Sequence, residues 1–296
     1  MQVAVLNGSP KGEMSVTMQY VRYLQKVFPE HKLKIHHISQ RIKRLEQDEE
    51  VFSQIIDEVH SSDAVLWASP VYYWLVPAQY KRFIELIWER GVAKAFAGKY
   101  AASLTTSVNF YDFTAHEYLQ AISEDLDMRF VGPFSAYMYD LLEEANRDAL
   151  RCFAEELFGA VQREAPTARR YPPTRQRAFE YTPESGAPKV DLAGHRMQII
   201  TDAQERDTNL ARMLQRFRGA FSTEVPVVNL LDVDIKGGCQ GCLHCGYDNQ
   251  CAQAHADGFV DFYESQVKPA DILILAGTIR YILGKHTVIW EKAKRG

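Results

Sequence analysis

The sequence predicts an α/β fold, with a doubly wound parallel sheet of five strands followed by a second, incomplete module of the same kind. Two observations lead to this prediction. Short apolar runs alternate with longer stretches of helical periodicity through residues 1–161, and the start of that pattern returns after residue 194. Strands that alternate with helices are joined by right-handed crossovers, so they form a parallel sheet that is covered on both faces.

The elements of the first module follow one another in a regular order. Each predicted strand is a short apolar or β-branched run, and the predicted helices show apolar residues at helical spacing. We predict strands at 1–6, 32–38, 64–68, 99–107 and 128–139, and helices near 15–28, 51–59, 114–126 and 141–161, with a fifth helix between the third and fourth strands. Residues 1–164 therefore form the first domain. Five prolines and several arginines then mark residues 165–194 as a linker before the second module at 195–296.

Length and composition limit the classes of function. The chain has 296 residues, of which 46% are hydrophobic, enough for two domains that each bury a core. With 34 basic and 38 acidic residues, its charge requires neither a nucleic-acid partner nor a membrane partner. The sequence enters a strand without an apolar leader, and no apolar run approaches the length of a membrane span. We therefore expect a cytoplasmic protein.

The loop after the first strand has the residue types of a phosphate site. Glycines at 8 and 12 allow tight turns, and the helix that begins near Ser15 presents unpaired N–H groups. A positive charge and three hydroxyls lie in the same stretch, at Lys11, Ser9, Ser15 and Thr17. This combination predicts a site for a phosphate monoester.

Two further loops are expected at the same edge, because ligands of open α/β sheets bind outside the carboxyl ends of the strands. The loop after the third strand is rich in aromatic residues, which suit a large planar ring: Pro70, Val71, Tyr72, Tyr73 and Trp74. An aromatic helix cap that packs the core is the alternative interpretation. The loop after the fourth strand brings two hydroxyls and an amide, from Thr106, Ser107 and Asn109.

The first two loops resemble those of the NAD(P)H-dependent FMN reductases, a flavodoxin-like family. That family has a G-S-x-R/K loop followed by S-x-T, and a Ser-Pro-Val/Ile-Tyr turn beside the isoalloxazine. The matching segments here are 8–17, which includes Val16, and 69–72. The resemblance implies FMN and NAD(P)H as cofactors. No catalytic acid or base is named, because hydride transfer to a flavin does not require one.

The second module departs from this pattern. Acidic residues at 202, 205 and 207 stand where the phosphate loop should be and would repel a dianion, so we expect no second flavin. Instead, four cysteines follow a C-x2-C-x2-C-x5-C pattern, namely Cys239, Cys242, Cys245 and Cys251. Such dense spacing is similar to that of the iron-sulfur flavoproteins and implies a [4Fe-4S] cluster. Zinc and an empty ligand set remain alternatives. The fifth cysteine, Cys152, is expected in the core.

Together these features predict a flavin-dependent NAD(P)H oxidoreductase that passes electrons to a small-molecule or protein acceptor. The alternative is a non-catalytic flavodoxin-like electron carrier or redox sensor with a metal site made of the four cysteines. Family members are usually dimers or tetramers, so the resemblance implies a homo-oligomer. The choice between NADH and NADPH stays open.

Overall fold

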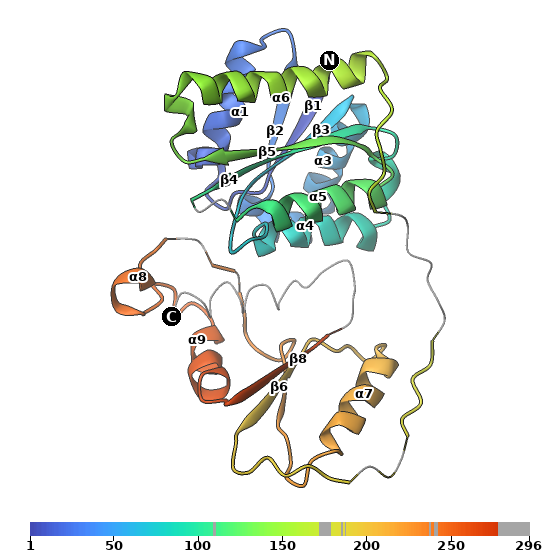
Figure 1. Ribbon diagram of the computed structural model, residues 1–296, viewed down its shortest axis with the longest axis vertical. Coiled ribbons are helices and arrows are strands. Elements are labelled where there is room, and N and C mark those ends of the chain that lie inside the picture. Colours follow the sequence, from blue (N-terminus) through green and yellow to red (C-terminus); the bar gives the residue numbers. More distant parts are fainter. Residues whose placement is uncertain are drawn as a thin grey trace. The chain divides into compact units, whose positions relative to one another are not determined.

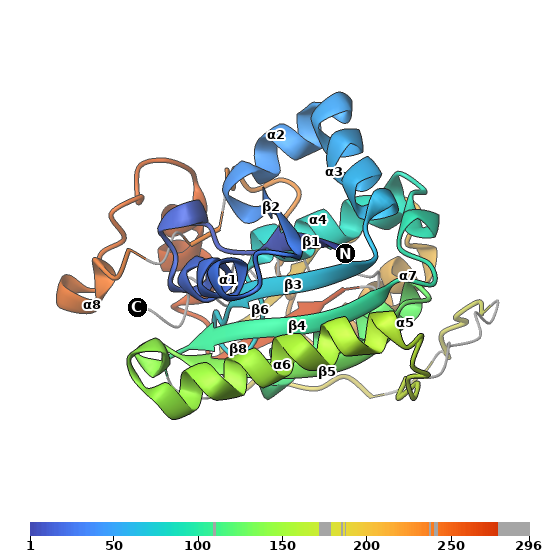
Figure 2. The ribbon, with the colours of Figure 1, turned by 90° about the horizontal axis from the view of Figure 1, so that it is seen from above.

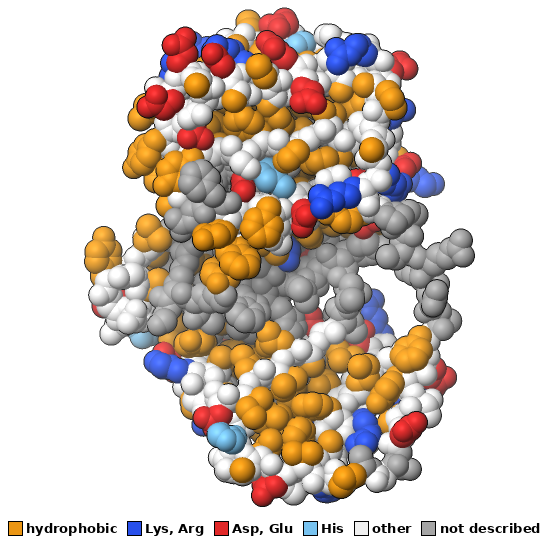
Figure 3. All heavy atoms as spheres, viewed as in Figure 1, with side chains coloured by type: hydrophobic (Ala, Val, Ile, Leu, Met, Phe, Trp, Pro, Cys, Tyr) orange, Lys and Arg blue, Asp and Glu red, His pale blue; other side chains and the backbone are white. Residues whose placement is uncertain are grey.

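The computed structural model describes residues 1–108, 111–171, 179–184, 186, 188–236, 238–239 and 242–277. The chain divides into two compact units, residues 1–174 and 175–296, here called the N-terminal and the C-terminal unit (Figure 1). Acidic and basic side chains are interspersed on the face of the N-terminal unit that Figure 3 shows. That face carries no large field of one sign, as the near balance of charges in the sequence predicts.

The N-terminal unit contains a five-stranded parallel sheet in the order β2-β1-β3-β4-β5, which confirms the predicted fold class. Its strands are β1 (Gln2–Asn7), β2 (Lys32–His37), β3 (Ala64–Pro70), β4 (Tyr100–Ser107) and β5 (Arg129–Tyr137). Its α-helices are α1 (Val16–Val27), α2 (Ile42–Gln47), α3 (Glu49–Ser61), α4 (Ala78–Glu89), α5 (Phe113–Asp125) and α6 (Glu144–Gln162). Short 3-10 turns cover Gly12–Met14, Ser39–Arg41, Ala93–Ala95 and Asp140–Leu142.

Helices cover both faces of this sheet (Figure 2). Residues of α1 and α6 pack in one apolar core, whereas residues of α3, α4 and α5 pack in the other. Strand β1 serves both layers, because Val3 and Val5 belong to the first core while Ala4 and Leu6 belong to the second. A strand buried on both faces has no polar side, which explains its nearly continuous apolar sequence.

The strand order reverses beside β1, and this reversal determines where a ligand can bind. The chain passes from β1 to β2 on one side and returns to β3 on the other, so the loops after β1 and β3 are neighbours. The amide of Gly8 donates to the carbonyl of Ala68 at 2.7 Å and joins the two strand ends. This is the switch point of a doubly wound sheet, at the carboxyl ends of the strands.

Two local features differ from the pattern expected along the chain. The charged run at 41–50 contains helix α2, which buries Leu45. Residues 165–171 also have a folded position, because they lie against α5. The carboxylate of Glu124, only 2% exposed, accepts hydrogen bonds from the backbone amides of Arg170 and Tyr171 at 3.0 and 2.6 Å. Local composition cannot show that a buried carboxylate elsewhere will satisfy these amides.

The C-terminal unit contains a three-stranded parallel sheet in the order β7-β6-β8. Its strands are β6 (Met197–Thr201), β7 (Val227–Asn229) and β8 (Ile272–Ala276). Its helices are α7 (Thr208–Arg218), α8 (Cys245–Asp248), α9 (Phe259–Phe262) and a π-helical turn at Tyr263–Val267. This order repeats β2-β1-β3, in agreement with the prediction of an incomplete second module.

The repeat extends to individual hydrogen bonds. Asp63, directly before β3, accepts from the amide of Gln2 at 2.8 Å, and Asp271, directly before β8, accepts from the amide of Arg196 at 2.7 Å. In both units the aspartate amide also donates back to the same partner's carbonyl, at 2.9 Å. The two units therefore fasten their first and third strands in the same way.

Candidate functional site

The loop after β1 is held in shape by the side chain of Asn7. Its Oδ1 atom accepts from the amide of Ser9 at 3.0 Å, and its Nδ2 atom donates to the carbonyl of Gly12 at 3.2 Å. The same Nδ2 atom lies 2.9 Å from Nδ1 of His37 on β2. Sequence reasoning missed this asparagine. Its position as the last residue of β1, directly before the glycine, was the available signal.

The predicted phosphate residues lie together at the N-terminus of α1. Ser15 is the N-cap residue, and its Oγ accepts from the amide of Met18 at 3.2 Å, which leaves its own hydrogen available to a ligand. Ser9, Ser15 and Thr17 are buried, Val16 is half-buried and Lys11 is exposed. Hydroxyls, amide groups at the helix start and one lysine suit a phosphate group.

The loop after β3 forms a tight turn with two aromatic residues at its centre. The amide of Tyr72 donates to the carbonyl of Leu75 at 2.7 Å, and the amide of Leu75 donates back at 3.3 Å. Tyr73 and Trp74 both have positive φ angles, 52° and 68°, a pattern typical of a type I′ turn and costly for residues other than glycine. Backbone strain of this kind is often retained at ligand sites.

The strained turn presents aromatic faces to solvent. The Tyr73 and Trp74 rings are about half exposed and nearly parallel, with centroids 5.9 Å apart. Trp74 also packs against Tyr111 at 5.8 Å and Phe113 at 6.2 Å, which follow β4. The sequence analysis did not select these two residues, although aromatic residues directly after a strand of this sheet were a usable signal.

The loop after β4 joins the other two loops. The Thr106 hydroxyl lies 2.6 Å from that of Thr17, and the Thr106 carbonyl accepts from the amide of Val71 at 2.9 Å. Ser107 is the last residue of β4, and Pro70 is the last residue of β3. Asn109 lies outside the described residues. The three predicted loops thus meet at one edge of the sheet.

The comparisons with known proteins identify the family. A family model described as a flavodoxin-like fold matches residues 1–157. The chain belongs to this flavodoxin-like family. A search of curated proteins gives no match.

Several solved structures are similar to about half of this flavodoxin-like chain. An apo NADH:FMN oxidoreductase (EMOB) is 18% identical, with 53% of this chain and 89% of that chain covered and a TM-score of 0.45. The flavoenzyme NAD(P)H:(acceptor) oxidoreductase FerB from Paracoccus denitrificans is 20% identical, with coverages of 55% and 97% and a TM-score of 0.42. An NADPH-quinone reductase from P. pentosaceus is 14% identical, with coverages of 53% and 98% and a TM-score of 0.43.

The C-terminal unit of this flavodoxin-like protein has a different loop after its first strand. The amide of Gln204 donates to the carboxylate of Asp207 at 2.7 Å, so the loop satisfies its own donor with an acidic side chain. Asp207 directly precedes α7, the position that Ser15 occupies before α1. A carboxylate in this position does not suit a phosphate group.

The four predicted metal ligands lie in the segment between β7 and α9. Within the described residues, Cys239, Cys242, Cys245 and Cys251 form no disulfide bond. Within the described ranges, no three His, Cys, Asp or Glu side chains come together as ligands of one metal ion. The described residues therefore give the predicted iron-sulfur cluster no support. Cys152, expected in the core, is exposed on α6, so that prediction is wrong.

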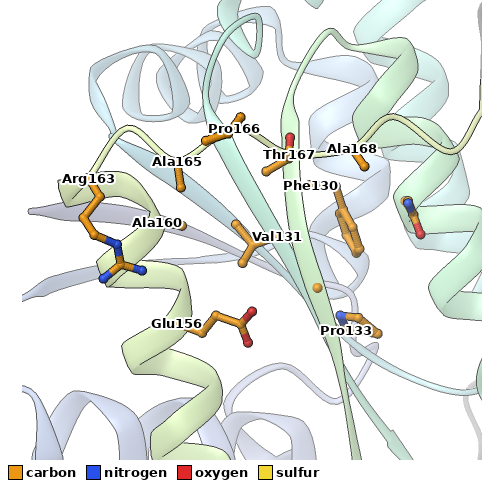
Figure 4. A pocket seen from close by; sticks show the side chains of 12 residues that line it. Phe130, Val131, Pro133, Glu156, Ala160, Arg163, Ala165, Pro166, Thr167 and Ala168 are labelled. Carbon is orange, nitrogen blue, oxygen red and sulfur yellow. The ribbon is translucent and has the colours of Figure 1, made fainter.

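A hollow of about 370 Å³ lies elsewhere on the N-terminal unit. Figure 4 shows its walls, with Glu156 of α6 and Arg163 directly after this helix at one side, β5 at the other and residues 165–168 across one end. It opens beside residues 130–133, in the first half of β5, and contains no predicted site residue.

In the part of the chain that is described, no helix is long and apolar enough to cross a membrane.

Proposed function

We propose that the N-terminal unit binds FMN and that the protein is an NAD(P)H-dependent oxidoreductase. The observation that carries this proposal is the meeting of three loops at the switch point of the sheet. One loop has the donors for a phosphate, the second has an exposed aromatic turn, and the hydroxyl of Thr106 links the third to α1. Phosphate at a helix start with a planar ring beside the next loop is the arrangement that FMN requires.

The phosphate and the ring of FMN are bound by different residues in this proposal. Ser9, Ser15 and Thr17, with Lys11 and the first amides of α1, bind the phosphate. The turn at 72–74 holds the ring, and its two neighbouring aromatic residues exclude water from one side of it. When bound, FMN supplies the redox chemistry by taking up a hydride from the nicotinamide. The protein binds and orients the two molecules, and no side chain is assigned as an acid or a base.

A comparison of two flavins tests the phosphate loop. FMN and riboflavin differ only in the phosphate, and a charge-assisted hydrogen bond contributes about 1.5–3 kcal/mol. We expect FMN to bind at least about tenfold more tightly than riboflavin, as measured by quenching of flavin fluorescence. Lys11→Met should reduce the difference in affinity between FMN and riboflavin, whereas Lys94→Met, away from the loop, should leave it unchanged. Equal affinity for both flavins would show that the loop is not a phosphate site.

Turnover separates the reductase from the carrier. A reductase with bound FMN should oxidise NADH or NADPH in the presence of a small-molecule acceptor. Comparing the rates with NADH and with NADPH shows which nucleotide the protein prefers, a choice that the sequence leaves open. A carrier should bind FMN but oxidise neither nucleotide at an appreciable rate. The proposal leaves the acceptor as a small molecule or a protein, and it includes a homo-oligomer as the working assembly.

The iron-sulfur cluster is not needed for this proposed function, and no electron-transfer step is assigned to it. It remains a prediction from the spacing of the four cysteines, because metal binding can itself order a ligand loop. Iron and acid-labile sulfide analysis of anaerobically purified protein tests it. Nearly four irons per chain, lost in Cys242→Ser, would support the cluster. Stoichiometric zinc would instead support the alternative, in which the four cysteines form a plain metal site.

A further inference from the structure

A polar network, buried except for the exposed Ser135, lies behind the proposed flavin site on the α5 side of the sheet. At its centre is His116 of α5, which is 8% exposed. Its Nδ1 atom lies 2.8 Å from Oγ of Ser103, and its Nε2 atom lies 2.9 Å from Oγ1 of Thr105. Oγ of Ser135 on β5 is 3.1 Å from Nε2, and Oδ2 of Asp112 is 3.4 Å from it. Every member of this network is distinct from the residues that the sequence analysis selected.

The hydrogen bonds of this network have one consistent direction. Asp112 accepts from the Thr105 hydroxyl at 2.9 Å, because a carboxylate has no proton to donate. Thr105 has then used its hydrogen, so the imidazole Nε2 must donate to the threonine oxygen. A neutral ring with its proton on Nε2 leaves Nδ1 to accept from the Ser103 hydroxyl. The chain of donors therefore runs from Ser103 through His116 and Thr105 to Asp112.

This chain of bonds holds two parts of the proposed FMN site. Thr105 directly precedes Thr106, which contacts Thr17 and accepts from the amide of Val71. Asp112 directly precedes α5 and lies between Tyr111 and Phe113, the two aromatic residues that pack on Trp74. A change in the bonding of the imidazole is therefore transmitted to the phosphate loop and to the aromatic turn.

We propose that His116 is a positioning residue of the flavin site, and that its neutral ring with the proton on Nε2 keeps Thr106, Tyr111 and Phe113 in the positions that bind FMN. This inference rests on the proposed FMN function. Protonation adds a hydrogen to Nδ1, so Ser103 has to turn and accept instead of donate. It also attracts Asp112 to the charged ring in competition with Thr105. FMN binding therefore weakens when the ring becomes charged.

The surroundings of the ring favour its neutral form. Burial lowers the pKa of His116, and the nearby Asp112 carboxylate opposes this shift only in part. The hydrogen-bond partners that β4 and β5 give the ring are the hydroxyls of Ser103, Thr105 and Ser135, and among the described residues Asp112 is the charged group that acts on it. In the unfolded chain the ring takes up its proton at about pH 6.5. Loss of affinity is therefore expected below that pH.

The test is the dissociation constant of FMN between about pH 7.5 and about pH 4.5, a range that extends well below the free histidine value of about 6.5 because burial lowers the pKa of His116. His116→Gln is the informative variant, because the amide both donates and accepts but does not titrate. We expect the affinity of the wild type to fall at least about fivefold more than that of His116→Gln over this range. His37 and the FMN phosphate titrate in both proteins, so their contributions cancel. His60→Gln, an exposed residue of α3, should behave as the wild type.

Two further measurements keep the inference falsifiable. Thr105→Val preserves shape but removes the link between His116 and Asp112, so it should bind FMN weakly at every pH. Nitrogen NMR of wild-type protein should show His116 with its proton on Nε2 at neutral pH. If FMN affinity has the same pH dependence in the wild type and in His116→Gln, or if the proton is on Nδ1, this inference fails while the proposed FMN function stands. No FMN binding by the wild type at any pH would overturn the proposed function as well.

Discussion

Replacing Gly8 by alanine is expected to destabilise the N-terminal unit by about 1–3 kcal/mol, the usual cost of overpacking, and to weaken FMN binding at least about tenfold. The new Cβ would lie 2.6 Å from Cδ1 of Tyr80 and 2.8 Å from Oγ of Ser69. Tyr80 cannot easily move, because it is fully buried and its hydroxyl donates to the carbonyl of Leu6 at 2.5 Å. The loop must shift instead, and the bond from the Gly8 amide to β3 is lost.

Chemical unfolding and FMN titration measure the two effects. Gly132→Ala is the matched control, because Gly132 lies on β5 of the same sheet and a Cβ there would meet no atom within 4 Å. We expect that control to bind FMN as the wild type does. A Gly8→Ala protein with unchanged stability and affinity would contradict the close approach of β1, β3 and α4 at this point.

Replacing Trp74 by glycine should separate affinity from stability. A planar ring stacked on an aromatic side chain gains about 1–3 kcal/mol, so FMN affinity should fall at least about tenfold. The free energy of unfolding should change by less than about 1 kcal/mol, because opposing effects offset each other. Glycine relieves the strain of a φ of 68°, which stabilises the fold, whereas the lost aromatic contacts and the higher entropy of the unfolded chain destabilise it. Flavin fluorescence titration and urea unfolding give the two quantities.

Two controls isolate the ring from the backbone. Trp74→Phe keeps an aromatic face and the strain, so its FMN affinity should stay within about threefold of the wild type. Glu164→Gly relieves a similar φ of 49° at an exposed position outside the site and should leave FMN binding unchanged. If Trp74→Gly binds FMN as tightly as Trp74→Phe, the aromatic turn is not the ring platform.

Much of the N-terminal fold could be predicted from local sequence. The strands are apolar runs bounded by glycine, proline and polar residues, and each predicted strand lies within a residue or two of an observed one. The helix start at Ser15 was also predictable, because a serine N-cap acts through its own neighbours. These signals need no knowledge of which segments meet.

The contacts that complete the site were not predictable in this way. His116 is 11 residues from Thr105 and 19 from Ser135, and its bonds exist only because β4, β5 and α5 pack together. A lone histidine on a helix carries no signal for such a network. The hydrogen bond between Asn7 and His37 joins residues even farther apart in sequence, 30 positions, because it crosses from β1 to β2.

The cysteines show the opposite case, in which a strong local pattern does not determine a site. Their spacing brings four thiols into 13 residues, yet ligand geometry depends on the backbone between them and on the metal itself. In the residues that the structure describes, this backbone forms only the single turn α8 beside Cys245. A pattern of ligands along the chain is thus weaker evidence than their positions in space.

The paired aspartates of the two units allow a comparison within a single chain. Asp63 and Asp271 make the same bonds, although the loop after β1 carries glycines and hydroxyls and the loop after β6 carries acids. If the two units arose by duplication, the aspartate that joins the first and third strands was kept in both units. The glycines and hydroxyls that could bind a phosphate were kept only in the N-terminal unit. The C-terminal unit then works as an internal reference: grafting residues 8–17 onto it would ask whether the loop alone is sufficient to create a flavin site.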